Sequence, residues 1–130
     1  MDLEKPLPVL EAAYNDALGI TADFNLNVLH RMNTELGADI NVDAFKHRAF
    51  YNEIDRRIEM HLVSSVTQEI CVAGTPFHFE AGETIHTENS HKYTPERFDA
   101  LAHLAGLKLV ETWTDPQGWF GVFYLEAASV

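Results

Sequence analysis

The sequence predicts an α+β fold: a helical hairpin and a mainly antiparallel β-sheet, followed by one more helix and a terminal β-hairpin. Two observations lead to this prediction. Apolar residues recur every three or four positions up to Gly37, as in amphipathic helices, and mostly every second position after Phe45, as in half-buried strands. The expected strands also follow one another without a helix between them until residue 93, which favours antiparallel pairing.

Two helices are expected before residue 40. The first follows two prolines and should end at Gly19; its apolar stripe contains Leu7, Leu10, Ala13, Tyr14, Ala17 and Leu18. Thr21 is the expected N-cap of the second helix, and Asp23 lies in its first turn, where the helix dipole favours an acid. The second helix should end at Gly37; its apolar residues are Leu26, Val28, Leu29, Met32 and Leu36. The short connection predicts a tight helical pair.

The alternating pattern then predicts five strands. Ile58, Met60 and Leu62 alternate with polar neighbours, which is typical of a strand with one buried face. Turns are expected at residues 52–55 and at Ala73 and Gly74. The expected strands cover residues 48–51, 57–63, 69–72, 77–79 and 82–93.

A capped helix and a hairpin are expected at the C-terminal end. Thr94 offers a capping hydroxyl, Pro95 suits the first helical position, and Glu96 places an acid in the first turn. The helix should end at Gly106, after an apolar stripe of Phe98, Leu101, Ala102 and Ala105. Two strands should follow at residues 107–113 and 119–125, around the turn Asp115-Pro116-Gln117-Gly118. The chain is therefore divided near Tyr93, into residues 1–93 and 94–130.

Composition and charge restrict the partners. The 130 residues are 46% hydrophobic, enough for one globular domain with a core. The formal net charge is −11, so nucleic acid and anionic membranes are poor partners, whereas a cationic or zwitterionic small molecule is suitable. The sequence shows no secretory signal pattern or membrane-spanning run, and the lone Cys71 has apolar neighbours that predict a buried, inert thiol. We therefore expect a reduced, cytoplasmic setting.

A polar row on the strand after Gly82 holds the candidate binding residues. Alternate side chains of a regular strand share one face, which would group Thr84, His86, Glu88, Ser90 and Lys92. Glu88 and Ser90 would then place a carboxylate and a hydroxyl about 7 Å apart, a spacing that suits a charged or donor-rich ring. Met60, on the apolar side of another strand, could supply a polarisable side chain to one wall of the pocket. The alternative is a solvent-facing edge strand, for which such rows are common.

Other chemistries have weaker support. The seven histidines raise the possibility of a metal, but His86 and His91 are an odd number apart and should face opposite sides of a strand. Cys71 has no flanking base, and the sequence contains no Gly-x-Ser-x-Gly elbow, phosphate loop or dinucleotide fingerprint. We therefore predict no catalytic, cofactor-binding or metal-binding residue. By residue type alone, Tyr14 and Phe24 are core aromatics, and Trp113 and Trp119 pack in the terminal hairpin.

Several strings resemble a known family: AAYNDALGITADFNLNVL, RIEMHL, AGETIHTENSHKYTPERF and WTDPQGWFGV. They are similar to the C-terminal part of the histidine-specific, S-adenosylmethionine-dependent methyltransferases, which trimethylate the α-amino group of histidine on the route to ergothioneine. The similarity runs from Asp2 to about Leu125. It implies two parts in a complete enzyme: a doubly wound domain that binds the methyl donor, and a lobe of helices and antiparallel sheet that closes over the amino acid.

The resemblance implies a role for five residues. Glu88 and Ser90 match the carboxylate and hydroxyl that hold the imidazole ring, and Met60 matches the methionine that lines the same pocket. Tyr14 matches a tyrosine near the amino-acid end of the substrate, and Phe24 an aromatic residue of the pocket. The polar row would then be a wall that recognises imidazole, because a carboxylate accepts a ring N–H and favours the charged ring.

The resemblance also predicts what this segment lacks. The donor-binding half of the family, with its glycine-rich loop, normally precedes the part that begins here, so S-adenosylmethionine is implied by the family while its site is absent from these residues. Residues 1–93 would be the substrate-recognition lobe, and residues 94–130 would complete a methyltransferase sheet. An exposed flank of the terminal hairpin should be covered, either in a homodimer or by a donor-binding partner chain.

The leading functional prediction is a histidine-recognition lobe that does not transfer methyl groups alone, because catalysis requires the donor methyl in line with the amine. A relative specific for an indole-bearing amino acid fits less well, since an indole has no second ring nitrogen for Glu88 to recognise. Two alternatives remain open. One is a non-enzymatic amino-acid-binding or protein-pairing module with the same fold. The other is a small metal-binding β protein whose metal would depend on His86 and His78.

Overall fold

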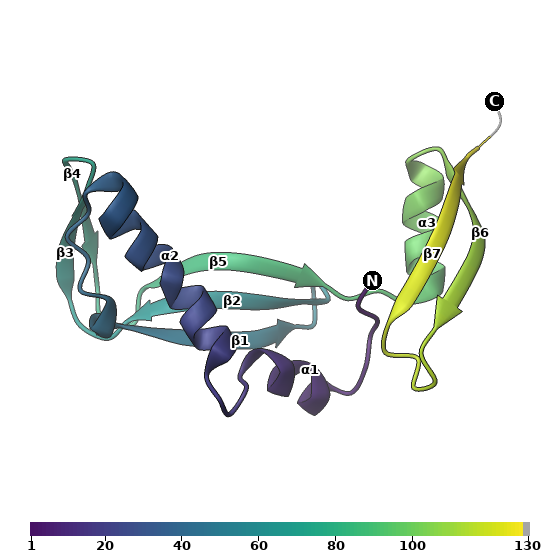
Figure 1. The fold of residues 1–130 in the computed structure, drawn as a ribbon, viewed down its shortest axis with the longest axis horizontal. Helices are drawn as coiled ribbons and strands as arrows, with labels where there is room; N and C mark the ends of the chain where they lie inside the picture. The colour runs from purple at the N-terminus through teal and green to yellow at the C-terminus, as the bar shows by residue number, and fades with distance from the viewer. Residues whose placement is uncertain (129–130) are drawn as a thin grey trace.

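The computed structural model describes residues 1–128, in which the elements before and after Tyr93 belong to different sheets (Figure 1). The larger part contains α1 (Leu7–Tyr14), α2 (Ile20–Leu36), the short 3-10 helix η1 (Val42–Ala44), β1 (Phe45–Asn52), β2 (Arg57–Ser64), β3 (Gln68–Val72), β4 (Thr75–Phe79) and β5 (Thr84–His91). The smaller part contains α3 (Pro95–Leu104), β6 (Leu107–Thr114) and β7 (Gly121–Ala127). The predicted α+β class is confirmed, whereas the functional division at residue 93 stays a prediction.

The helical pair differs from its prediction at the connection. α1 ends at Tyr14 rather than at Gly19, and Thr21 lies inside α2 rather than at its N-cap. The carboxylate of Asp16 caps α2 instead, accepting hydrogen bonds of 2.9 Å from the backbone N–H groups of Ile20 and Thr21. Gly19 occupies the cap position with φ +73°, a conformation that glycine adopts without strain. An acceptor placed before the turn therefore replaces the predicted threonine cap.

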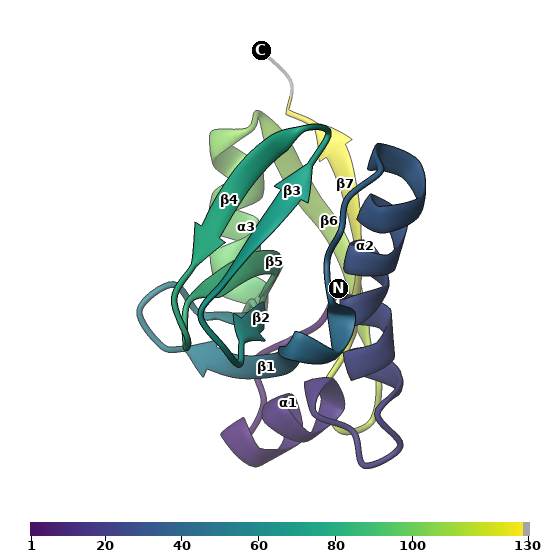
Figure 2. The ribbon, with the colours of Figure 1, turned by 90° about the vertical axis from the view of Figure 1, so that its left-hand side faces the viewer.

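The main sheet has three antiparallel strands in the order β1-β2-β5, and β3 and β4 form a separate hairpin. α1 packs on β1, and α2 packs on β1, β2 and β3. Figure 2 views the β3–β4 end of the molecule, with α2 beside that hairpin. Two clusters of buried residues form the core between helices and sheet: Leu29, Ile40, Phe45, Leu62 and Ile70 in one, and Leu10, Ala49, Ile58 and Met60 in the other.

A β-bulge changes which way the β5 side chains face. Ser90 and Glu88 pair with Ile58 and Met60, but the register shifts after Met60 and His86 then pairs with His61. Paired residues share a face, so Glu88 and Ser90 lie on the helix-covered side of the sheet while Thr84 and His86 lie on the other side. The prediction of a single polar row is therefore wrong, because it assumed an unbroken two-residue period.

The smaller part packs α3 on one face of the β6–β7 hairpin. The hydroxyl of Thr94 accepts a hydrogen bond from the Arg97 N–H at 3.3 Å, which confirms the predicted helix cap. The rings of Phe98 and Phe123 lie 4.8 Å apart across the contact between helix and hairpin. On the opposite face, apolar side chains are about half exposed: Trp113 (49%), Val122 (53%) and Tyr124 (49%). The predicted exposed flank is thus present on this part of the structure.

The N-terminal segment runs between the two parts. Leu3 forms a parallel bridge with Tyr93, and Asp2 forms an antiparallel bridge with Phe120 (Figure 1).

The burial of two side chains differs from its prediction: Cys71 is half-buried rather than buried, and Trp119 is 41% exposed. No helix within residues 1–128 is both long and apolar enough to cross a membrane.

Candidate functional site

A pocket of about 240 Å³ opens between α2 and the bulged part of β2 and β5. Three of the five predicted binding residues line it, namely Phe24, Met60 and Glu88. Met60 is buried, whereas the Phe24 side chain is 65% exposed, so the pocket has an apolar base and an aromatic rim. The full lining consists of Phe24, Asn25, Asn27, Val28, Arg31, Met60, Thr87 and Glu88.

Asn25 and Thr87 hold the pocket in shape, and neither residue was predicted from the sequence. Asn25 is buried; its amide nitrogen contacts His47 Nδ1 at 3.0 Å and the His61 carbonyl at 3.1 Å. The Thr87 hydroxyl lies 2.6 Å from Asn25 Oδ1 and 3.0 Å from the Met60 carbonyl. Helix α2 is thereby attached to the bulge. The available signal was the position of Asn25, four residues before Leu29 on an apolar helix stripe, because a buried amide must find partners.

Tyr14 and Ser90 form a second group beside this pocket. The Tyr14 hydroxyl donates to Ser90 Oγ at 2.7 Å. Lys92 is fully buried, and its ammonium group lies 2.9 Å from Tyr14 Oη, 2.7 Å from Ser90 Oγ and 2.7 Å from Asp2 Oδ2. Because Ser90 follows Glu88 by two residues on the same face, the pocket and this group are adjacent. The five predicted residues therefore fall into two neighbouring sets rather than one.

Lys92 was predicted only as a member of the polar row, with no role of its own. A fully buried lysine requires partners for its three N–H donors, and here all three are matched. Burial raises the pKa of the Asp2 carboxyl, but the hydrogen bonds and charges of Lys5 and Lys92 outweigh this effect and lower it below its usual value. Asp2 is thus an ionised partner for Lys92 at neutral pH.

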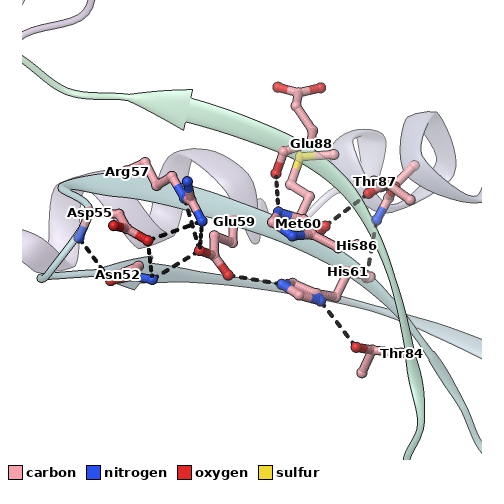
Figure 3. A network of polar contacts seen from close by, with 11 residues as sticks. Asn52, Asp55, Arg57, Glu59, Met60, His61, Thr84, His86, Thr87 and Glu88 are labelled. Carbon is pink, nitrogen blue, oxygen red and sulfur yellow. Dashed lines mark hydrogen bonds and ion pairs between the residues drawn. The ribbon is translucent and has the colours of Figure 1, made fainter.

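The opposite face of the sheet carries a separate network (Figure 3). Glu59, His61 and His86 have potential ligand atoms within 4.8 Å of one another. The Glu59 carboxylate accepts hydrogen bonds from Asn52 at 2.9 Å and from Arg57 at 2.9 Å, and it lies 3.1 Å from His61 Nε2. These contacts lower the pKa of Glu59 to about 2, and the hydrogen bond from Asn52 has the largest effect. In Figure 3 the Glu88 carboxylate points away from this network.

This network corrects the sequence-based view of the histidines. His86 and His91 were expected on opposite faces, but pairing with His61 and Arg57 puts both on the same face, because the bulge lies between them. His78, the other histidine of the metal-binding alternative, instead contacts Glu80 at 3.0 Å. The rings of His61 and His86 stack at 4.4 Å with planes 15° apart. Ring lone pairs lie in the ring planes, so rings stacked in this way do not aim at one metal ion, and Arg57 already balances the Glu59 charge.

Comparison with known proteins adds independent information. The family of histidine-specific, SAM-dependent methyltransferases matches residues 1–127. A histidine N-alpha-methyltransferase from Mycolicibacterium smegmatis is 46% identical over 123 residues, and one from Mycobacterium tuberculosis is 43% identical over 123 residues. Each match covers 93% of this chain and 38% of the relative, so the chain spans about two fifths of their length. An N-methyltransferase from Aspergillus flavus is 25% identical over 114 residues, which cover 87% of this chain and 31% of that protein.

Proposed function

Because this chain belongs to the family of histidine-specific, S-adenosylmethionine-dependent methyltransferases, we propose that it is the histidine-recognition lobe of an Nα-methyltransferase-like protein. The observation that carries the proposal is the position of Glu88. Its side chain lines the pocket above Met60 and beside Phe24, and Ser90 follows on the same face of β5. Within residues 1–128 the Glu88 carboxylate makes no hydrogen bond or ion pair, so it is free to bind a ligand.

The chemistry of these groups suits an imidazole ring. An ionised carboxylate only accepts hydrogen bonds, so Glu88 selects a ligand N–H. A hydroxyl two residues along the strand lies about 7 Å away, a distance that an aromatic ring and its two hydrogen bonds can span. Met60 and Phe24 supply polarisable and aromatic surface for the faces of the ring. Tyr14, bonded to Ser90, fixes the hydroxyl that completes the set.

The methyl donor does not fit the residues described here. Donor sites of this type follow a strand in a parallel sheet, at a glycine-rich turn before a helix. Within residues 1–128 every strand pair is antiparallel, and the one parallel contact is the single bridge between Leu3 and Tyr93. We therefore infer that methyl transfer requires a donor-binding part outside these residues, in a longer chain or in a partner chain, and that residues 1–130 alone are inactive.

The exposed face of the β6–β7 hairpin is the surface we assign to that donor-binding part. Trp113, Val122 and Tyr124 are each about half exposed on it, and the matched relatives are more than twice as long as this chain. Sedimentation velocity tests the assignment: the isolated chain should be monomeric or only weakly associated, and Trp113→Asp should not change its mass. A stable dimer that Trp113→Asp dissociates would instead favour a second copy of this chain as the occupant.

Calorimetric titration with L-histidine tests the recognition lobe directly. The wild-type chain should bind saturably, and Glu88→Ala should weaken binding by about tenfold or more, because it removes a charge-assisted hydrogen bond of about 1.5–3 kcal/mol. Glu53→Ala is the matched control, since Glu53 is an exposed glutamate in the β1–β2 turn, outside the pocket. L-Tryptophan should bind far more weakly than L-histidine. Equal affinities of Glu88→Ala and the wild-type chain would contradict the proposal.

A further inference from the structure

The hydrogen bonds around Ser90 determine what its hydroxyl can offer to a ligand. A serine hydroxyl has one O–H donor and two acceptor lone pairs. Lys92, 2.7 Å away, can only donate to it, because an ammonium group has no lone pair. Tyr14 also donates to it, at 2.7 Å, because a phenol is a better hydrogen-bond donor than an aliphatic hydroxyl. Both lone pairs of Ser90 are therefore occupied, and only its O–H remains for a ligand.

Lys92 is held firmly in the position that imposes this pattern. Its ammonium group donates to Tyr14, Ser90 and Asp2, and Asp2 is held in turn by Lys5. Its backbone is also fixed, because the N–H of Lys92 donates to the Arg56 carbonyl at 2.9 Å. No solvent reaches the side chain, so water does not compete for these hydrogen bonds. The donor character of Ser90 is thus built into the folded lobe.

We propose that Lys92 is a positioning residue that makes Ser90 an obligatory donor, so that the lobe selects the neutral form of an imidazole ring. The inference rests on the proposed function and deepens it. Glu88 requires a ring N–H, and Ser90 requires a bare ring nitrogen; a neutral imidazole offers one of each. An imidazolium ring would instead direct its second N–H at the O–H of Ser90. Glu88 alone would favour the charged ring, as predicted from the sequence; the hydrogen bonds around Ser90 reverse that preference.

The pH dependence of histidine binding distinguishes the two forms of the ring. With a ring pKa of about 6.5, the neutral fraction of histidine falls about tenfold between pH 7.5 and pH 5.5. The wild-type affinity for L-histidine should fall by about the same factor. A triazole analogue, β-(1,2,4-triazol-3-yl)-alanine, has a ring that stays neutral across this range, so its affinity should change little and it controls for effects of pH on the protein.

The Lys92→Met variant tests the role of Lys92 itself. Without the ammonium group, one lone pair of Ser90 is free to accept a ring N–H, and the charged ring becomes acceptable. The affinity for L-histidine should then change by less than about threefold between pH 7.5 and pH 5.5, compared with about tenfold in the wild type. Asp2 keeps Lys5 as a partner in this variant. Should Lys92→Met not fold by circular dichroism, Tyr14→Phe frees the other lone pair while Lys92 remains, and it should flatten the pH profile in the same direction.

Three results would overturn the inference, and they are distinguishable. Wild-type affinity for L-histidine that is equal or higher at pH 5.5 would show that the charged ring is bound. An unchanged tenfold loss in folded Lys92→Met, or in Tyr14→Phe where that variant replaces it, would remove the role of Lys92. The absence of any histidine binding at pH 7.5 would overturn the proposed function together with this inference, whereas the first two results would leave the proposed function intact.

Discussion

The two faces of the β2–β5 strand pair carry similar side chains in different states. On the open face, the carboxylate of Glu59 is shared by Asn52, Arg57 and His61, so both of its oxygens already have partners within the protein. On the helix-covered face, Glu88 lines a pocket and, among the described residues, has no partner for its carboxylate. The contrast makes Glu88, rather than the cluster around Glu59, the carboxylate that is available to a ligand on these strands.

Replacing the two glutamates should separate stability from binding, and this is the largest effect we expect from the comparison. Glu59→Ala should lower the free energy of unfolding by about 1–3 kcal/mol, because Asn52 and Arg57 lose one acceptor and keep only the carboxylate of Asp55, while histidine affinity changes less than twofold. Glu88→Ala should instead weaken histidine binding, while its free energy of unfolding stays within about 0.5 kcal/mol of the wild type. Urea unfolding and calorimetric titration of both variants measure the two quantities.

Acid provides a control for the Glu59 effect. The pKa of Glu59 is lowered from 4.5 to about 2 in the folded chain, so its contribution is fully present above about pH 4.5 and is lost as the pH falls through 2. The difference in unfolding free energy between the wild type and Glu59→Gln should therefore shrink as the pH falls from 5 towards 2. A difference that does not shrink, or a loss of binding in Glu59→Ala equal to that in Glu88→Ala, would contradict the distinction between the faces.

Thr87 sets the boundary between the two faces, and we expect a smaller effect there. Thr87→Val keeps the shape of the side chain but removes the hydroxyl that contacts Asn25 and the Met60 carbonyl, which should cost about 1 kcal/mol of stability. Histidine affinity should fall a few-fold because α2 is less firmly attached to β5. Thr84→Val is the matched control on the same strand, where the hydroxyl contacts only His61 Nδ1, at 3.2 Å on the opposite face of the sheet. Equal effects of the two variants would show that the bulge contact has no special role.

Local signals in the sequence predicted the local structure well. The hydroxyl of Thr94 caps α3 as expected, and the alternating pattern of Ile58, Met60 and Leu62 corresponds to the buried face of β2. The predicted cap of α2 was wrong because Asp16, which lies before the turn, takes the place of Thr21. Either side chain is chemically suitable as a cap. Such a choice depends on the path of the turn rather than on residue type.

The candidate site could be predicted only in part, because its decisive features are not local. Glu88 and Met60 were identified and do line one pocket. The bulge is a property of the pairing between β2 and β5, so no pattern within β5 alone reveals that the facing changes at Thr87. The partners of Lys92 lie in three different segments, and Asp2 is ninety positions away in sequence. The prediction therefore placed all five residues of the row on one face, which is wrong, and the environment of Lys92 was not predicted.

The bridge between Leu3 and Tyr93 has a consequence for how the larger part, residues 4–92, can be inherited. The Glu4 N–H donates to the Tyr93 carbonyl at 3.0 Å, so the chain enters and leaves the larger part at neighbouring points. A unit whose ends meet can be inserted into a host protein, or exchanged for another unit, without stretching the host chain. Under the proposed function, replacing residues 4–92 as one unit while the junction at Leu3 and Tyr93 is kept would change the amine that is recognised.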